Sequence, residues 1–382
     1  MFGSIPPRAF RSRGVGRSGS HPCPRRPMTR ILALLVLPSV LLAGCQRAQS
    51  AEPPRPADTM DRAERLAMQG RIVFVSEREG NADVYVVDAQ GKKAARLISS
   101  ESADYPAAIS PNGRDVLVVA VSGEEQQVER MALVPLDGSA ARAIGPVSAR
   151  VRSPSWSPDG EWIVFESDTA SFRDLYRMRR DGTALTRLTD NPEGNFEPVY
   201  SPDGRSIAFV SSRDGDAELY VMNADGGAPR RITAFHRDDW YARWSPDGRT
   251  LAFLSNRESR DRIYLVSADG SGVRPLNASA DSTMEAEPAW SPDGAHVAYT
   301  VARQGTPGAR LAVTNVRTGQ RRILSAETES AGAPSWSPDG RYIAYTSTVA
   351  GEADIRVVRV DGGGTATIVR APGADWLPRW IR

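Results

Sequence analysis

The side chains best suited to binding or catalysis are acidic or amide residues that stand beside aromatic or basic ones. They recur at nearly constant intervals along the chain. The candidate site residues are Asp104, Tyr105, Arg152, Asn195, Phe196, Glu197, Asp239, Trp240, Glu285, Glu287, Asp375 and Trp376. Carboxylates interleaved with aromatic rings can hold a cationic peptide segment or a sugar. Two carboxylates about 5–10 Å apart could alternatively serve as general acid and base on a carbohydrate.

The same residues also have a purely structural interpretation. Asp and Asn side chains often hydrogen-bond the backbone of local turns, and aromatic rings can cover seams between sheets. One repeat carries Ala331-Gly332 at the equivalent place, which would leave a shallow side on any rim. Both interpretations stay open from the sequence.

The elements that must position these residues are marked by one four-residue turn written six times. It occurs once as Ser-Pro-Asn-Gly and five times as Ser-Pro-Asp-Gly, with its serine at 110, 157, 201, 245, 291 and 337. Ser, Pro and Gly occupy the positions that a type I turn favours. Successive serines are 44 to 47 residues apart. A period near 40–45 residues is typical of propeller blades.

Each repeat contains four short strands joined by tight turns. In the unit from 198 to 233, apolar runs at 207–210 and 219–222 alternate with turn residues. Four strands in this order form an antiparallel meander, which is one blade. Residues 71–98 supply only three strands, and 377–380 supply the missing one. We therefore expect an all-β, seven-bladed propeller, with six blades as the alternative, closed by pairing of the C-terminal strand with the N-terminal blade.

The front of the chain has the features of a secretion signal. Residues 31–44 are rich in apolar residues but too short to span a bilayer, and Arg30 precedes them. The segment Leu42-Ala43-Gly44-Cys45 resembles the bacterial lipoprotein signal, which implies acylation of Cys45. We predict a signal peptide over 1–44, in which 1–27 is a misassigned extension before Met28. A lipidated cysteine and tether then occupy 45–70, with a short helix over 58–68, and the propeller occupies 71–382.

The net charge and the cysteines limit the kinds of partner that the chain could bind. Residues 1–44 hold seven arginines and no acid, so the remaining chain has 41 basic and 46 acidic residues. A mildly acidic domain argues against nucleic-acid binding. The two cysteines, Cys23 and Cys45, leave no disulfide after processing. Gln46 after the cysteine favours the outer membrane in bacterial sorting patterns.

Searches for known chemistry give no catalytic, metal or cofactor assignment. Two histidines, His236 and His296, follow the leader, and we interpret both as surface residues. No nucleophile elbow, phosphate-binding loop or dinucleotide motif occurs. Repeated Asp-Gly pairs are explained by hairpin turns.

The order Trp-Ser-Pro-Asp-Gly, Ile-Ala-Phe, Leu-Tyr-Val-Met, Asp-Gly and Arg-Leu-Thr resembles the WD40-like repeats of the TolB-like β-propeller family. The resemblance covers 71–382. It implies a propeller, and relatives of this kind include binding modules, gating domains of serine peptidases and oligogalacturonate lyases. TolB itself carries an α/β domain before a six-bladed propeller and is not normally acylated, whereas 25 residues separate Cys45 from Arg71 here. The resemblance therefore indicates a propeller lipoprotein of this family and not TolB itself.

These observations favour a non-enzymatic, monomeric binding module. We expect it on the periplasmic face of the outer membrane of a Gram-negative bacterium, held by its lipid anchor. It would dock an envelope protein or peptide at the channel mouth. The alternative is a carbohydrate-active or other enzyme that uses carboxylates at the channel rim.

Overall fold

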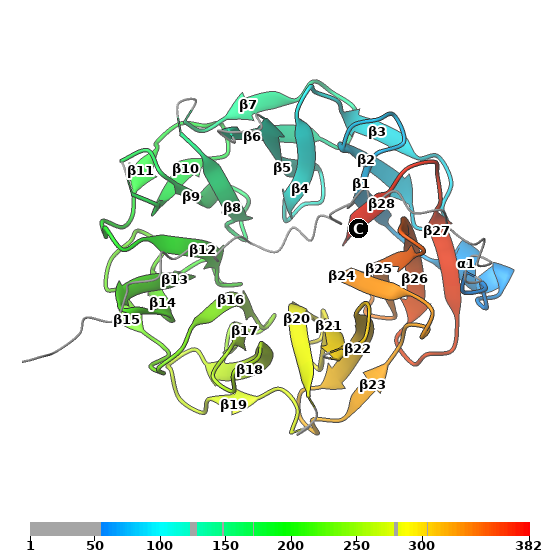
Figure 1. Cartoon of the computed structure of the whole chain (residues 1–382). Helices are drawn as coiled ribbons and strands as arrows, with labels where there is room; N and C mark the ends of the chain where they lie inside the picture. The colour runs from blue at the N-terminus through cyan, green and yellow to red at the C-terminus, as the bar shows by residue number, and fades with distance from the viewer. Residues whose placement is uncertain (1–54, 123–127, 147–148, 171, 279–281, 304) are drawn as a thin grey trace, which may run out of the picture. The chain divides into compact units, whose positions relative to one another are not determined.

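The computed structural model describes residues 55–382 except 123–127, 147–148, 171, 279–281 and 304. The described chain forms seven four-stranded antiparallel sheets arranged as blades around a central channel (Figure 1). This confirms the expected all-β, seven-bladed propeller and excludes the six-bladed alternative. The signal peptide, Cys45 and the first part of the tether lie outside the described residues.

Within each blade the strands run in order from the channel to the outer edge. Blade 1 consists of β28 (Asp375–Ile381), β1 (Arg71–Ser76), β2 (Asp83–Asp88) and β3 (Ala95–Ile98). Blade 2 consists of β4 (Ala103–Ile109), β5 (Asp115–Ser122), β6 (Val128–Pro135) and β7 (Arg142–Ile144). Blade 3 consists of β8 (Val151–Trp156), β9 (Trp162–Ser167), β10 (Asp174–Arg179) and β11 (Thr186–Arg187). Blade 4 consists of β12 (Asn195–Tyr200), β13 (Ser206–Asp214), β14 (Asp216–Asn223) and β15 (Arg230–Arg231).

The remaining blades repeat this order. Blade 5 consists of β16 (Asp239–Trp244), β17 (Thr250–Ser255), β18 (Arg262–Ser267) and β19 (Arg274–Pro275). Blade 6 consists of β20 (Thr283–Trp290), β21 (His296–Arg303), β22 (Arg310–Asn315) and β23 (Arg321–Ile323). Blade 7 consists of β24 (Ser330–Trp336), β25 (Tyr342–Val349), β26 (Glu352–Arg359) and β27 (Thr365–Val369).

The two ends of the propeller close the ring inside blade 1. The C-terminal strand β28 pairs with β1, with Arg71 opposite Ile381 and Ile72 opposite Trp380. Without this pairing β1 and β28 would each present a free inner edge. The pairing predicted from the out-of-phase repeats is therefore confirmed.

Each Ser-Pro-Asp-Gly turn is held by its own side chains. In blade 4, Gly204 N–H donates to the Ser201 carbonyl at 2.9 Å, and Gly204 has a φ of +71°, which glycine adopts readily. Ser201 Oγ donates to Asp203 Oδ1 at 2.6 Å and accepts from Ser206 N–H at 3.0 Å. The hydrogen bond from Ser201 lowers the pKa of Asp203. The turn thus fixes the register of the two inner strands.

The core lies mainly between the blades, where one bulky residue per innermost strand crosses each seam. In three blades the indole N–H donates to a backbone carbonyl of the preceding blade. These bonds run from Trp244 to Val199 (3.2 Å), from Trp290 to Arg243 (3.0 Å) and from Trp336 to Ala289 (2.9 Å). Each ring therefore buries a large apolar area while its polar edge stays satisfied.

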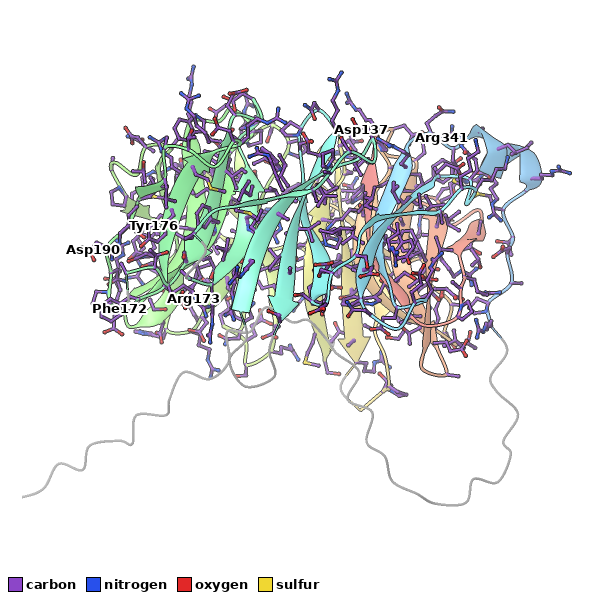
Figure 2. The ribbon with its side chains drawn as sticks, turned by 90° about the horizontal axis from the view of Figure 1, so that it is seen from above. Asp137, Phe172, Arg173, Tyr176, Asp190 and Arg341 are labelled. Carbon is purple, nitrogen blue, oxygen red and sulfur yellow. The ribbon has the colours of Figure 1, made fainter. Side chains whose placement is uncertain are left out.

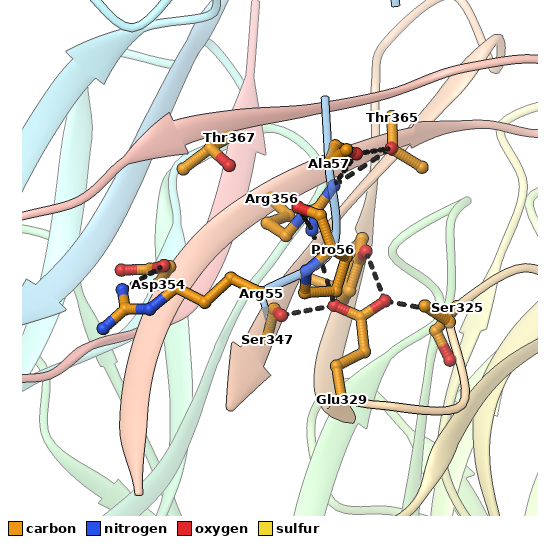
Figure 3. Close-up of polar contacts among 12 residues, drawn as sticks. Arg55, Pro56, Ala57, Ser325, Glu329, Ser347, Asp354, Arg356, Thr365 and Thr367 are labelled. Atoms are coloured by element: carbon orange, nitrogen blue, oxygen red, sulfur yellow. Dashed lines mark hydrogen bonds and ion pairs between the residues drawn. The ribbon is translucent and has the colours of Figure 1, made fainter. Parts of the chain in front are cut away.

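The residues before β1 are bound along blade 7. The Arg356 guanidinium is almost fully buried and donates to the carbonyls of Pro56 (2.8 Å) and Ala57 (3.1 Å), as Figure 3 shows. Thr59 N–H donates to the Thr365 carbonyl at 2.8 Å. These contacts tie the end of the tether to the outer strands of the blade.

The tether also contains the expected short helix. Helix α1 (Arg62–Ala67) begins where Asp61 accepts a hydrogen bond from Glu64 N–H at 2.7 Å. It is shorter than the predicted 58–68, because residues before the cap hydrogen-bond with blade 7 instead.

The two faces of the ring carry different connections. Phe172, Arg173 and Asp190 lie on one face, here called the mouth face (Figure 2). It carries the hairpins between second and third strands and the links between blades. Asp137 and Arg341 lie on the opposite face, with the Ser-Pro-Asp-Gly turns. Since each innermost strand starts at the mouth face, its first residues surround that end of the channel.

Candidate functional site at the channel mouth

The innermost strands share a β-bulge two to four residues after they begin in most blades. Six non-glycine residues at this bulge have φ between +48° and +57°: Ser153, Glu197, Tyr241, Glu287, Ala333 and Leu377. The pairing between β12 and β13 shifts here, with two residues opposite one. Such a backbone costs of order 1 kcal/mol or more per residue. Surrounding contacts must therefore hold it.

Side chains from the preceding blade supply part of that support by accepting the N–H of the bulged residue. Glu197 Oε2 accepts from Tyr241 N–H at 2.6 Å, and Glu287 Oε2 accepts from Ala333 N–H at 2.8 Å. Thr346 Oγ1 serves in the same way for Leu377 N–H at 3.0 Å. Two predicted site residues, Glu197 and Glu287, are thus links between neighbouring blades.

Glu197 is the most perturbed of these carboxyl groups. Burial, together with the neighbouring Glu166 carboxylate, raises the pKa of Glu197 to about 7. Arg243 and the hydrogen bond from Tyr241 N–H oppose this shift without cancelling it. Glu166 itself accepts from Glu197 N–H at 3.1 Å. The group is therefore placed to change charge near neutral pH.

Three further predicted residues are fully buried and held by an arginine at the hairpin of their own blade. The pairs are Asp239 with Arg257 (2.9 Å), Asp375 with Arg78 (3.0 Å) and Asn195 with Arg213 (3.2 Å). Each arginine is two residues after a serine whose Oγ accepts from its Nε, at 2.7 to 2.9 Å. We call this arrangement the arginine clasp.

The arginine clasp also uses the aromatic residues of the blade. The guanidinium carbon lies 4.3 Å from the Tyr264 ring centre in blade 5, and 4.5 and 4.6 Å from Tyr85 and Tyr220 in blades 1 and 4. Burial raises the pKa of Asp239, while Arg257 lowers it. A sequence signal for these clasps exists: a serine stands two residues before the arginine at 76–78, 211–213 and 255–257. Our sequence analysis missed this pattern.

Asp104 and Glu285 are buried without a clasp. Asp104 Oδ1 accepts from Ser100 Oγ at 3.1 Å, but its Oδ2 has no hydrogen-bond partner among the described residues. Burial raises the pKa of Asp104 to about 6, and the buried Asp83 carboxylate adds to the shift. Glu285 accepts from Ile263 N–H at 2.9 Å and from Asn277 Nδ2 at 2.7 Å.

Three of the four predicted aromatic residues remain partly open to solvent. Tyr105 and Trp376 lie in adjacent blades with ring centres 5.5 Å apart, and Trp240 is half-buried on blade 5. Phe196 is buried, with the Arg173 guanidinium 5.3 Å from its ring centre. Arg152 forms an ion pair with Glu129. Most polar members of the predicted set are therefore buried, Arg152 and Glu287 are partly exposed, and Tyr105, Trp240 and Trp376 form a partly exposed aromatic layer.

This arrangement offers more for contact than for proton transfer. The rim carboxylates sit in different blades, and most are engaged by an arginine or by backbone N–H groups. Within the described residues, no group of three or more His, Cys, Asp or Glu side chains is placed to hold a metal ion. The described part of the chain also contains no helix with the length and apolar character needed to cross a membrane.

Comparison with known proteins gives a family for this architecture. A family model described as the TolB beta propeller domain matches residues 68–191, 126–282 and 262–382. The uncharacterized protein Atu1656 of Agrobacterium fabrum is 36% identical over 135 residues, which cover 35% of this chain and 45% of that protein. A protein TolB homolog of Chlorobaculum tepidum is 31% identical over 119 residues, covering 31% of this chain and 26% of that protein. The match thus spans less than half the length of either relative.

A solved structure shares the fold at low identity. The oligogalacturonate lyase from Vibrio parahaemolyticus superimposes with a TM-score of 0.61 and 16% identity, covering 75% of this chain and 85% of that protein. At this identity the likeness concerns the fold alone.

Proposed function

The chain belongs to the TolB beta propeller family, and from this premise we propose that it is a non-enzymatic binding module that docks an envelope protein or peptide at the channel mouth. The observation that carries the proposal is the contrast between the two kinds of rim residue. Asp239 and Asp375 are closed off and matched by arginines, whereas Trp240 and Trp376 are partly exposed. Aromatic side chains with one open face are favoured anchors at protein interfaces.

The enzymatic alternative has one observation in its favour. Asp83 and Asp104 are neighbouring buried carboxyl groups with raised pKa values, and each has one oxygen without a hydrogen-bond partner among the described residues. Their exposed fractions are 2% and 0%. A substrate atom cannot reach a carboxylate that water does not reach. We therefore favour binding over carbohydrate chemistry.

The location of the module is part of the proposal. A signal peptide over 1–44 and acylation of Cys45 would hold it at the periplasmic face of the outer membrane of a Gram-negative bacterium. The net acidic charge after residue 44 fits a protein partner better than nucleic acid. The site needs residues from one ring of blades only, so a monomer suffices.

The test is mild crosslinking of the full-length protein in its own membranes, followed by purification and mass spectrometry. The variant Trp240→Leu/Trp376→Leu removes both rings but keeps apolar side chains. Phe172→Leu serves as a control. Phe172 is 47% exposed on the mouth face, but it lies in the hairpin between β9 and β10 and not on an innermost strand. We expect a partner that is recovered with wild type and the control and lost with the double variant. Equal recovery with all three proteins would place the docking surface elsewhere.

A further inference from the structure

Two arginines occupy the innermost strands immediately before the bulky seam residue. They are Arg243 on β16 of blade 5 and Arg379 on β28 of blade 1. The equivalent residues of the other blades are uncharged: Ala108, Ser155, Val199, Ala289 and Ser335. The two side chains also adopt matching hydrogen bonds. Nη1 of Arg243 donates to the Ala242 carbonyl at 2.9 Å, and Nη1 of Arg379 donates to the Pro378 carbonyl at 3.2 Å.

Arg243 and Arg379 occupy the same register position on the innermost strands of two blades that are not adjacent, so both belong to one layer of the channel wall. Arg243 lowers the pKa of Arg379, and Glu287 and Tyr241 raise it. These three residues belong to blades 5 and 6, whereas Arg379 belongs to blade 1, with blade 7 between. Side chains from blades that are not adjacent can approach one another only through the central channel. Arg243 also lies over the Tyr241 ring at 3.8 Å.

Neither guanidinium forms an ion pair with the described residues. The two nearby carboxylates are already engaged, because Glu197 accepts from Tyr241 N–H and Glu287 accepts from Ala333 N–H. The pKa of Arg379 is lowered by burial despite the attraction of Glu287. The two channel arginines therefore have hydrogen-bond donors that no carboxylate uses, in contrast to Arg78 and Arg257 in the arginine clasps.

We propose that Arg243 and Arg379 bind a carboxylate of an acidic peptide segment inside the channel. Trp240 and Trp376 lie three residues closer to the start of the same two strands, and Tyr105 of β4 contacts Trp376, so the aromatic layer would contact the rest of the segment. Guanidinium groups bind carboxylates through paired, charge-assisted hydrogen bonds. The inference rests on the proposed docking function. It differs from the cationic ligand considered from the sequence, because Asp239 and Asp375 are paired with arginines, whereas Arg243 and Arg379 have no carboxylate partner among the described residues.

A peptide segment fits this layer better than a polyanion such as nucleic acid. The chain after residue 44 carries more acidic than basic residues, which disfavours long anionic partners at a distance. A single acidic side chain or C-terminal carboxylate on a segment with apolar neighbours matches both the arginines and the aromatic layer.

The test is an unbiased selection of random eight-residue peptides on the immobilised full chain, for wild type and for Arg243→Gln/Arg379→Gln. We expect the peptides retained by wild type to be enriched in Asp, Glu or a free C-terminus. The same peptides should bind the double variant roughly tenfold or more weakly, as for loss of charged hydrogen bonds. The control Arg205→Gln/Arg249→Gln makes the same change in net charge at exposed residues of the Ser-Pro-Asp-Gly turns, and it should bind like wild type.

The outcomes separate this inference from the proposed function. Retained peptides without acidic enrichment, or with equal binding to the arginine double variant, would overturn the carboxylate site and leave docking at the mouth intact. No retained peptide at all would overturn docking and this inference together. In that case the melting temperature of both proteins is measured with succinate at constant ionic strength. A rise in wild type but not in the double variant would assign the arginines to a small dicarboxylate instead.

Discussion

The Glu197 carboxylate of blade 4 accepts a hydrogen bond from the backbone N–H of Tyr241 in blade 5 at 2.6 Å. Tyr241 is a bulged residue with φ of +57°, so its N–H points away from the strand ladder and needs an acceptor from elsewhere. One buried side chain thus joins two blades at the point where the channel wall is most strained. This role explains why an acidic residue is present at 197 without any need for catalysis.

The first prediction concerns how Glu197 makes stability depend on pH. Its pKa is about 7 in the folded protein and near 4.5 when unfolded, so the folded state binds the proton more tightly. The stabilisation is complete below pH 4.5 and is lost as pH rises through 7. We expect Glu197 to lower the free energy of unfolding by about 3 kcal/mol between pH 4.5 and 8.

Urea unfolding of wild type and Glu197→Gln at both pH values measures this effect. The glutamine keeps an oxygen that accepts from Tyr241 N–H but does not titrate. Asp104 is present in both proteins, so its own contribution cancels in the difference. An identical pH dependence of the two proteins would show that Glu197 does not carry the raised pKa.

The second prediction concerns the arginine clasp of blade 5. Arg257→Met leaves the fully buried Asp239 carboxylate without its cation, and we expect a loss of about 3–5 kcal/mol in the free energy of unfolding. Asp239→Asn should cost only about 1 kcal/mol, because blade 4 already uses Asn195 with Arg213 in the same place. Chemical denaturation of both variants gives the comparison. Equal losses would mean that Asp239 is not held mainly by Arg257.

The sequence predicted those features of the fold that depend on interactions between residues close together in the chain. The Ser201-Pro-Asp-Gly204 turn is held by atoms within a few residues of one another, so its six copies predicted six blades, and the strands at 71–98 and 377–380 predicted the seventh. The aromatic residues Tyr105 and Trp376 were placed near the channel by their position in the repeat, and they do contact each other. Local patterns therefore predicted the fold and the register of the candidate site.

The burial and the hydrogen-bond partners of the polar rim residues could not be predicted in the same way. Asp239 is neutralised by Arg257, 18 residues away, and Glu197 is used by Tyr241, 44 residues away in the next blade. The contact of Glu197 depends on the bulge, which has no strong residue preference, since Ser, Glu, Tyr, Ala and Leu all occur there. Arg243 and Arg379 line one channel only after the ring closes through β28. Burial and charge balance are therefore properties of the assembled ring.

The third prediction concerns the segment bound to blade 7. Arg356 donates to the carbonyls of Pro56 and Ala57 and to Thr365 Oγ1. We expect Arg356→Gln to lower the free energy of unfolding by about 2–3 kcal/mol and to speed tryptic cleavage after Arg62 and Arg65. Denaturation and timed proteolysis with mass spectrometry measure the two effects.

Arg370→Gln provides the control for that experiment. Arg370 pairs with Asp354 on the same blade at 2.9 Å, but its side chain is 47% exposed. Exposed ion pairs contribute little, so we expect a change below about 1 kcal/mol and unchanged cleavage. Similar effects of both substitutions would show that Arg356 does not hold the segment.

The last prediction concerns the stability of the channel arginines themselves. Arg243 and Arg379 lack ion pairs with the described residues, and burial lowers the pKa of Arg379, so their charges disfavour the folded state in the absence of a ligand. The contact of Arg243 with the Tyr241 ring offsets part of this cost. We therefore expect Arg243→Gln/Arg379→Gln to leave the free energy of unfolding unchanged or to raise it by about 1–2 kcal/mol. Arg257→Met should do the opposite, because that arginine has its carboxylate. Denaturation of both proteins in the same buffer decides the point: a loss of more than about 2 kcal/mol in the channel double variant would mean that these arginines stabilise the fold.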